Sequence, residues 1–368
     1  MRIGILTFHN GNNYGGILQC YALQQTFVSL GHSVEIINYS STHSLSIWNK
    51  IKAKLATIDS LKSLYGLLKD LFRKGNTAKF DEYLNKQSLQ VFDRFRSNYL
   101  NLSPVLTTET IGEYTNRHFD LIVVGSDQVW TPLFDSPLAY MIEWEPQFKG
   151  KRMSYAACSA YKDLRGSRKK KIKSCLEKFD LITVRDNTTQ QLVNNVLGKE
   201  PLIVPDPSLL YPYEEFIKEE EREPYILTYI LGSEIIGGHK KALDKIKAKI
   251  GDLPVYSIII PCNSHDIEAY ADKAFATLSP AEWVNLFYHA SYVYTDSFHA
   301  IMFSLKFKKL FAAYYRNKVR SSRLLDLKAK GISCIYADAD ELEVTNEVYS
   351  EVMLKGDFLM KNLLKTLK

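Results

Sequence analysis

The sequence predicts an α/β protein made of two doubly wound domains that face each other across a cleft. Short apolar runs typical of buried strands alternate with helix-like segments in both halves of the chain. The length of 368 residues exceeds the size at which a single hydrophobic core usually stops growing. Between the halves lies the charged stretch EEFIKEEEREP (214–224), which we interpret as a solvated linker. We therefore expect a first domain over 1–213 and a second over 225–333.

The first half opens with a strand, a helix and a second strand. RIGILTF (2–8) is a continuous apolar run, as in strands buried on both faces of a parallel sheet. Residues 15–30 carry apolar side chains at near-helical spacing and end at Gly31. SVEIINY predicts the second strand, and FDLIVVGSD and FDLITVRD predict two more, each entered through Phe-Asp.

Residues 41–115 interrupt this alternation and predict a helical insertion in the first domain. Within 45–74 an apolar stripe that includes Trp48 and Leu55 runs beside many Lys and Arg residues. Apolar stripes most often face a protein core, which would pack this segment on the rest of the chain. The alternative is peripheral contact with an anionic membrane surface, where such a helix lies in the interface plane.

The second half repeats the alternation of strands and helices. YILTYIL, PVYSIII, SYVYTDS and KLFAAYY predict four strands. Helices are expected over 238–250 and 280–290 and from about residues 298 and 321. We expect residues 334–368 to form a helical tail that packs back on the first domain. In such sheets ligands bind at the carboxyl ends of strands, so the region between the domains is the expected site.

Composition excludes several classes of protein. The net charge of +6 is mild and fits a small acidic ligand or an anionic surface better than nucleic acid, for which no motif is present. Five scattered cysteines without a CxxC pair predict neither a disulfide framework nor a zinc site. No apolar run reaches the roughly 18 residues of a spanning helix, and no signal-peptide pattern precedes the first strand. We expect a cytoplasmic protein with no bound metal or separate cofactor.

The first candidate ligand site follows the first strand, in the stretch NNYGG. Gly15 and Gly16 would let backbone N–H groups approach a ligand at a helix N-terminus. The side chains of Asn12, Asn13 and Tyr14 could add hydrogen bonds. The alternative is a helix cap with turn glycines, because short motifs of this kind are weak signals.

VVGSDQVW marks the end of a second buried strand. Ser126 and Asp127 could cap the segment that follows, with Gln128 beside them. Alternatively, Asp127 could receive a proton from a hydroxyl group.

Arg185 comes directly after the strand in ITVRDN. A guanidinium group is a planar fork suited to carboxylate or phosphate. It would either bind an anionic ligand or pair with a structural carboxylate, for which Asp186 and Asp206 are candidates.

The stretch YTDSFHAIMF joins a strand to a helix in the second half. Ser297 is a good N-cap, and Phe298 and His299 would open the helix, where free N–H groups attract anions. Histidine can move a proton near pH 7, although a lone histidine is more often structural. Further along lie three arginines that would either supply positive potential or form a solvated basic face: Arg316, Arg320 and Arg323.

Five stretches together resemble the polysaccharide pyruvyl transferase family. They are GILTFHNGNNYGGILQCYALQ, FDLIVVGSDQVW, ITVRDN, VPDPSLL and YTDSFHAIMFSLKFKKLF, which span about residues 1–330 in the order seen in that family. The resemblance implies a GT-B fold of two Rossmann-like domains. It also implies transfer of pyruvate from phosphoenolpyruvate to two hydroxyls of one sugar, which forms a cyclic ketal and releases phosphate.

The resemblance also implies roles for particular residues. His299 and Arg185 match donor-site positions of the family. Some relatives have Arg-Leu-His where this chain has Ser297, Phe298 and His299. Either the donor differs, or the role of the absent arginine passes to one of the three downstream arginines: Arg316, Arg320 or Arg323.

These observations lead to one functional hypothesis and two alternatives. We expect His299 to act as the acid, Asp127 as the base for the acceptor hydroxyl, and residues 12–16 with Ser126 and Gln128 to border the acceptor. The substrates would be phosphoenolpyruvate and a sugar, in a polysaccharide or its lipid-linked precursor at the inner membrane face. A nucleotide-sugar-dependent glycosyltransferase and a non-catalytic saccharide-binding protein are the alternatives, since fold does not fix function.

Overall fold

The computed structural model describes nine segments of the chain. They are residues 1–40, 78–131, 138–145, 147–164, 166–232, 234–260, 270–316, 322–345 and 356–367. Two sequence predictions fall outside these segments: the membrane-contact stretch 45–74 and the donor role of Arg320.

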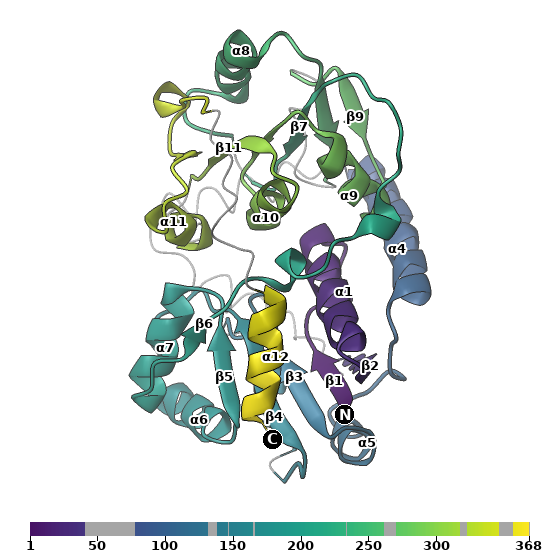
Figure 1. Ribbon diagram of the computed structural model, residues 1–368, viewed down its shortest axis with the longest axis vertical. Helices are drawn as coiled ribbons and strands as arrows, with labels where there is room; N and C mark the ends of the chain where they lie inside the picture. The colour runs from purple at the N-terminus through teal and green to yellow at the C-terminus, as the bar shows by residue number, and fades with distance from the viewer. Residues whose placement is uncertain are drawn as a thin grey trace.

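Two parallel six-stranded sheets form the framework (Figure 1). The first sheet has the order β2-β1-β3-β4-β5-β6, so its strand order reverses direction between β1 and β3. There Ile5 pairs with Val123, and the polar residues that follow both strands emerge at one edge. Its strands are β1 (Arg2–Leu6), β2 (Ser33–Ile36), β3 (Leu121–Val124), β4 (Lys151–Ala157), β5 (Leu181–Val184) and β6 (Leu202–Ile203).

The second sheet has the order β12-β11-β10-β7-β8-β9, with its switch point between β7 and β10. Thr295 at the end of β10 pairs with Tyr229 at the end of β7. The sheet extends to β12, beyond residue 333, where we predicted the second domain to end. Its strands are β7 (Ile226–Tyr229), β8 (Val255–Ile258), β9 (Lys273–Phe275), β10 (Tyr292–Thr295), β11 (Leu310–Tyr314) and β12 (Ile335–Tyr336).

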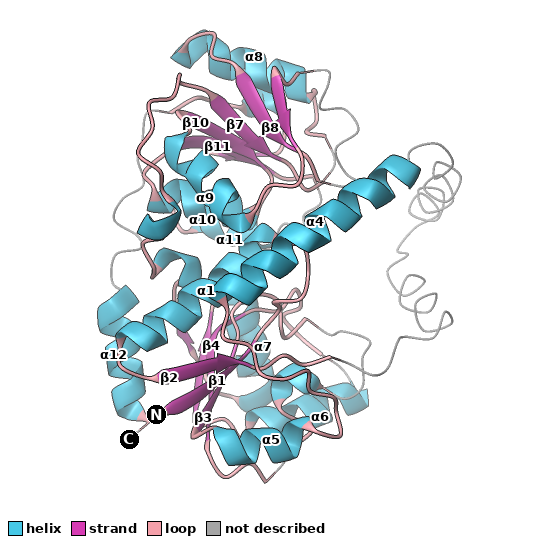
Figure 2. Cartoon of the chain, turned by 90° about the vertical axis from the view of Figure 1, so that its right-hand side faces the viewer, coloured by secondary structure: helices cyan, strands magenta, loops and turns pink. Residues whose placement is uncertain are grey.

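Helices connect the strands and cover the sheets. Figure 1 shows α1 and α10 where the two lobes meet, and Figure 2 shows α4 running along the side of the molecule past both lobes. Both views place α12 beside the first sheet, and its residue Met360 is fully buried. The helices are α1 (Tyr14–Ser29), α4 (Ala78–Tyr99), α5 (Ile111–His118), α6 (Gly166–Leu176), α7 (Asn187–Leu197), α8 (His239–Ile250), α9 (Pro280–His289), α10 (Phe298–Lys306), α11 (Ser322–Ala329) and α12 (Gly356–Thr366).

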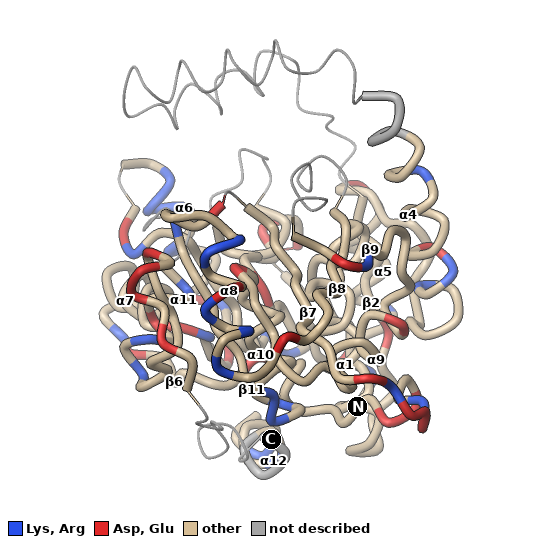
Figure 3. Tube along the Cα trace, turned by 90° about the horizontal axis from the view of Figure 1, so that it is seen from above, with Lys and Arg blue, Asp and Glu red and all other residues tan. Residues whose placement is uncertain are grey.

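The lysine-rich stretch 168–173, which we interpreted as a solvated face, lies on α6. Figure 3 shows basic positions along α6 and again along α8. Those of α6 meet acidic partners at the surface, with Lys169 Nζ 3.7 Å from Asp163 and Lys171 Nζ 3.7 Å from Glu143. Exposed pairs of this kind contribute little to stability.

The linker 214–224 is exposed except at Phe216, which is buried, and Ile217, which is half-buried. That ring is buried against Tyr21, Phe95 and Tyr99, and a short 3-10 turn (Glu214–Phe216) carries it. The linker is therefore anchored at one end to the first domain, and its exposed remainder leads into β7.

A continuous apolar core joins the two lobes. The ring of Tyr14 at the start of α1 stacks on Trp283 of α9, with centroids 5.7 Å apart and planes 13° from parallel. The hydroxyl of Tyr14 donates to the backbone carbonyl of Leu278 at 2.9 Å. Tyr213 of the connecting segment donates to the carbonyl of Leu18 at 3.1 Å. The two contacts of Tyr14 fix the start of α1 against the second domain.

Neither a membrane span nor a metal cluster is found in the part of the chain that the structure describes. No helix there is both long and apolar enough to cross a bilayer. Those same segments contain no group of three or more His, Cys, Asp or Glu side chains arranged to hold a metal ion.

Candidate active site between the two domains

The guanidinium group of Arg185 lies at the centre of a buried cluster of charged residues. It follows β5 at the carboxyl edge of the first sheet and is held between two carboxylates. Nη1 donates to Asp206 Oδ2 at 2.6 Å, and Nη2 donates to Asp127 Oδ1 at 3.2 Å. Asp206 also accepts from the backbone N–H and the hydroxyl of Ser208, and Ser126 donates to it at 3.2 Å. Of the two carboxylates that the sequence left open, Arg185 pairs with Asp206.

Asp186 is a helix-capping residue. It caps α7 by accepting from Thr189 N at 2.8 Å, and it accepts from the buried thiol of Cys158. Its carboxylate is thus engaged by the helix that it begins.

His299 enters the same cluster from the second domain. It lies in the first turn of α10, with Nε2 at 3.9 Å from Asp206 Oδ2. That nitrogen is buried and has no hydrogen-bond partner among the described residues. The imidazole of residue 299 and the guanidinium of residue 185 therefore share one carboxylate, although they come from different domains.

Gly15 makes this arrangement possible. A Cβ atom built on Gly15 would overlap Cγ and Nδ1 of the His299 ring, whereas one on Gly16 would find its nearest neighbour at 3.6 Å. The close approach of the α1 backbone to the imidazole thus requires glycine at position 15 and not at position 16.

Phe298 and Arg323 complete the cluster. The guanidinium carbon of Arg185 lies 4.5 Å from the centroid of the Phe298 ring, and that of Arg323 lies 5.4 Å from it. Arg323 Nη1 is 3.6 Å from Asp127 Oδ1. Both arginine Nε atoms are buried without a hydrogen-bond partner among the described residues. With His299, the cluster presents three unpartnered nitrogens, and buried polar groups in this state call for a ligand or solvent partner.

A pocket of about 230 Å³ opens beside this cluster. One wall comes from the ends of β5 and β6, and the other comes from α10, α11 and the chain after α11. Its lining comprises Arg185, Asp186, Ile203, Val204, Pro205, Asp206, Phe298, Met302, Arg323, Asp326, Leu327, Lys330 and Ile332. We name it the donor pocket, after the role that the sequence predicts for Arg185.

The charges in the cluster shift one another's pKa values. Burial opposes ionisation of Asp127, yet Arg185, His299 and Arg323 lower its pKa to about 2. Burial likewise opposes ionisation of Asp206, but Arg185 and His299 leave its pKa below the ordinary value. Burial lowers the pKa of His299, and this effect together with the two arginines outweighs the nearby carboxylates. The imidazole is therefore neutral at neutral pH in the free protein.

The remaining candidates from the sequence take other positions. Asn13 caps α1, accepting from Gly16 N at 3.1 Å, and Asn12 donates to Asn85. Ser297 caps α10 through Ala300 N at 3.4 Å. Arg316 donates to the backbone carbonyl of Glu234 instead of entering the cluster, and Gln128 is half-buried beside Asp127 in the chain.

The sequence alone did not reveal Asp296 as a candidate. It directly follows β10 at the switch point of the second sheet, and its Oδ1 accepts from Leu231 N at 2.6 Å. Oδ2 lies 2.7 Å from where a Cβ on Gly232 would be, so glycine there leaves room for the carboxylate. Burial raises the pKa of Asp296 to about 6, although backbone N–H groups oppose the shift. Its position directly after a buried strand is the sequence feature that could have identified it as a candidate site residue.

The molecule resembles solved structures over its whole length. The UDP-GlcNAc 2-epimerase of Methanocaldococcus jannaschii is 13% identical, with a TM-score of 0.53 and coverage of 99% of each chain. The UDP-GlcNAc 2-epimerase of Neisseria meningitidis, solved with UDP-GlcNAc bound, is 7% identical, with a TM-score of 0.50 and coverage of 99% of each chain. No curated protein sequence matches the chain.

Two parallel doubly wound sheets that meet around a buried, charged cluster define a protein of the GT-B fold, with two Rossmann-like domains. Within that class, the family model for polysaccharide pyruvyl transferase matches residues 13–317. The chain therefore belongs to the polysaccharide pyruvyl transferase family. The match includes Asp127, Arg185, Asp206 and His299, whereas Arg323 lies beyond its end.

Gly15→Ala should destabilise the protein, while Gly16→Ala should not. The added methyl group at position 15 overlaps the His299 ring, and overpacking of this kind costs about 1–3 kcal/mol. At position 16 there is room, and alanine should be neutral or stabilising by up to about 1 kcal/mol. Urea denaturation measures both changes. Equal stabilities for the two variants would contradict the close approach of α1 to His299.

Asp296→Asn should stabilise the protein above pH 7 by on the order of 3 kcal/mol. The folded-state pKa of about 6 lies above the ordinary value, so folding favours the protonated carboxyl and the penalty grows as pH rises through 4 to 6. Asparagine has no such penalty. Urea denaturation at pH 4.5 and pH 8 should show a gap that opens with pH, with Asp244→Asn, at an exposed position of α8, as the control variant. A gap that is equal at both pH values would refute the raised pKa.

Proposed function

We propose that this chain transfers pyruvate from phosphoenolpyruvate to two hydroxyls of one sugar, in a polysaccharide or its lipid-linked precursor. The observation that carries the proposal is the convergence of Arg185, Arg323 and His299 from both domains, each with a buried nitrogen that lacks a partner in the described chain. Membership of the family supports the same chemistry.

Phosphoenolpyruvate carries a carboxylate and a phosphate, and the donor pocket offers groups for both. The Nε atoms of Arg185 and Arg323 are available donors, and guanidinium groups bind such anions through parallel hydrogen bonds. The N-terminus of α10 adds backbone N–H groups and the positive end of the helix dipole. Arg323 takes the donor role that the arginine before Leu-His has in some relatives.

The two arginines are balanced by Asp127 and Asp206, so an incoming anion competes with these carboxylates. The anion also stabilises a protonated imidazole, which raises the pKa of His299 from its lowered value. Donor binding thereby favours protonation of His299, and this proton is the one that the reaction needs.

In the reaction, His299 gives its proton to the methylene carbon of phosphoenolpyruvate, which becomes a methyl group. One sugar hydroxyl bonds to the central carbon and loses its proton to a base, for which we propose Asp127. The bond from that carbon to the phosphate oxygen then breaks, and phosphate leaves with a proton. The second hydroxyl bonds to the same carbon and loses its proton, which closes the ketal. Overall, one hydroxyl proton ends on the methyl group and the other on phosphate.

The low pKa of Asp127 makes it a weak base in the free protein. It becomes more basic as the donor anion offsets the positive field of Arg185 and Arg323. We further propose that residues 12–16, Ser126 and Gln128 border the acceptor. The nucleotide-sugar glycosyltransferase and the non-catalytic saccharide-binding protein have only the shared fold in their favour.

His299→Ala should abolish phosphate release from phosphoenolpyruvate in the presence of sugar acceptors without unfolding the protein. General acid catalysis contributes about 100- to 10,000-fold, so the rate should fall by at least about 100-fold. A panel of sugars assayed for phosphate measures this. His118→Ala, at an exposed histidine of α5, should retain the wild-type rate. Activity of the His299 variant within tenfold of wild type would refute the acid role.

Binding of phosphoenolpyruvate should be accompanied by proton uptake at pH 7.5. The imidazole of the free protein is neutral, and the bound anion raises its pKa. The complex therefore holds more protons than the free protein and free phosphoenolpyruvate together. Calorimetric titration in Tris and in HEPES should give enthalpies that differ in proportion to the ionisation enthalpies of the buffers. His299→Gln should bind with equal enthalpies in both buffers. Equal enthalpies for the wild type would contradict this coupling.

A further inference from the structure

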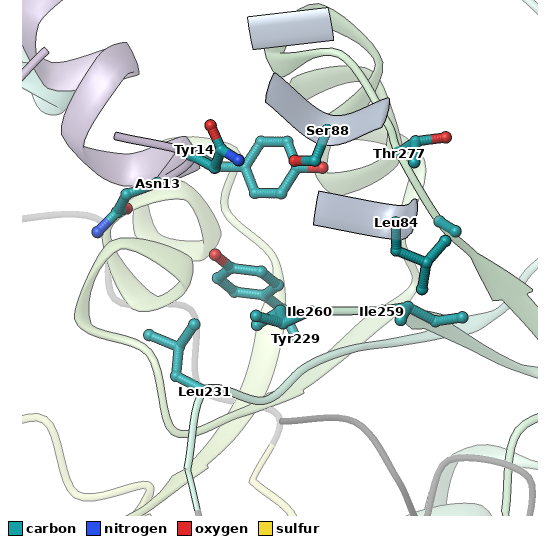
Figure 4. A pocket seen from close by; sticks show the side chains of 11 residues that line it. Asn13, Tyr14, Leu84, Ser88, Tyr229, Leu231, Ile259, Ile260 and Thr277 are labelled. Carbon is teal, nitrogen blue, oxygen red and sulfur yellow. The ribbon is translucent and has the colours of Figure 1, made fainter. Parts of the chain in front are cut away.

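A second pocket, of about 180 Å³, lies between the domains at the start of α1 (Figure 4). Its first wall comes from the start of α1 and from α4. Its second wall comes from the ends of β7, β8 and β9, which is where doubly wound sheets bind ligands. We name it the interdomain pocket; it is lined by Asn12, Asn13, Tyr14, Leu84, Ser88, Tyr229, Leu231, Ile259, Ile260, Ala276 and Thr277.

We infer that the interdomain pocket binds one sugar ring of the acceptor, an inference that rests on the proposed function. The first argument is charge. Every lining residue that the structure describes is neutral, which contrasts with the arginines and carboxylates of the donor pocket. Burying an anion in a neutral and largely apolar pocket is costly, so phosphoenolpyruvate or a diphosphate belongs elsewhere.

The second argument is the chemistry of the walls. Figure 4 shows the rings of Tyr14 and Tyr229 beside the space that Leu84 and Leu231 border. The two rings lie 6.0 Å apart and are inclined by 76°. A pyranose has C–H faces that pack on aromatic and aliphatic side chains and a rim of hydroxyls that needs polar partners.

Polar partners are available around these apolar walls. Asn12 Oδ1 is buried without a partner in the described chain, and it can accept from a sugar hydroxyl. Ser88 and Thr277 add hydroxyl groups to the lining. Tyr14 is held by its stacking on Trp283 and its bond to Leu278, so this wall is preorganised.

The third argument is position and size. Tyr14 precedes Gly15, whose backbone touches the His299 ring, and Leu231 N donates to Asp296. One lining residue is thus the chain neighbour of the glycine packed on the proposed acid, and another is bonded to a carboxyl whose pKa is about 6. The volume is below the roughly 300–1,000 Å³ of pockets that take drug-sized ligands, so one ring fits better than a whole nucleotide.

Two tryptophan substitutions placed two residues apart test the inference. Ala276 lines the pocket, so Ala276→Trp should fill it. Ala274 lies in the same strand region, is exposed and does not line the pocket, so Ala274→Trp is the matched control. Saturation-transfer NMR would use three probes: the methyl β-pyranosides of galactose, glucose and mannose. At least one should show transfer with the wild type and with Ala274→Trp, and at least fivefold less with Ala276→Trp.

Phosphoenolpyruvate binding, measured by thermal shift, separates this inference from the proposed function. Equal shifts for all three proteins, with sugar binding lost only in Ala276→Trp, would support both. A second outcome is that sugar binding is lost in Ala276→Trp while phosphoenolpyruvate gives no thermal shift even with the wild type. This outcome would support sugar binding in the interdomain pocket and refute phosphoenolpyruvate as the donor. The inference is overturned if no glycoside binds the wild type, if Ala276→Trp binds as the wild type does, or if uridine displaces the glycoside.

Discussion

The buried charge of Arg185 is the constraint on which the rest of the site depends. A guanidinium group this far from water is tolerated only when it is paired, and here Asp127 and Asp206 pair with it. These carboxylates follow β3 and β6, so the pairing fixes two loops at the carboxyl edge of the first sheet. Removing either carboxylate would leave an uncompensated buried charge, at a cost of about 3–5 kcal/mol in comparable cases.

The same pairing explains why the site joins two domains and not one. Asp206 faces both Arg185 from the first domain and His299 from the second. Phe298 lies against the guanidinium group of Arg185, where a ring face attracts a cation. The packed start of α1 excludes water from the imidazole and lowers its pKa. Stability and reactivity are thus linked, because a ligand must replace interactions that hold the free protein together.

Much of the framework could be predicted from the sequence, because strands buried on both faces are continuous apolar runs. Strand β4 was missed because Arg152 and Ser154 interrupt its apolar pattern. Both are buried in the sheet, where Ser154 donates to the carbonyl of Thr183 and Arg152 to that of Glu145. Helices α6 and α7 were not assigned, since the first is rich in lysine and the second in polar residues.

The site was harder to predict, because its contacts join residues far apart in the chain. The junctions that hold Asp127, Arg185 and His299 could be recognised locally, but no local signal shows that Gly15 makes room for residue 299. Ser297 gives the clearest case. It uses its side chain to cap α10, and the second guanidinium group near Phe298, besides that of Arg185, belongs to Arg323 on α11. Packing, and not spacing along the chain, decides which guanidinium groups come together, so the sequence could offer three downstream arginines but could not choose among them.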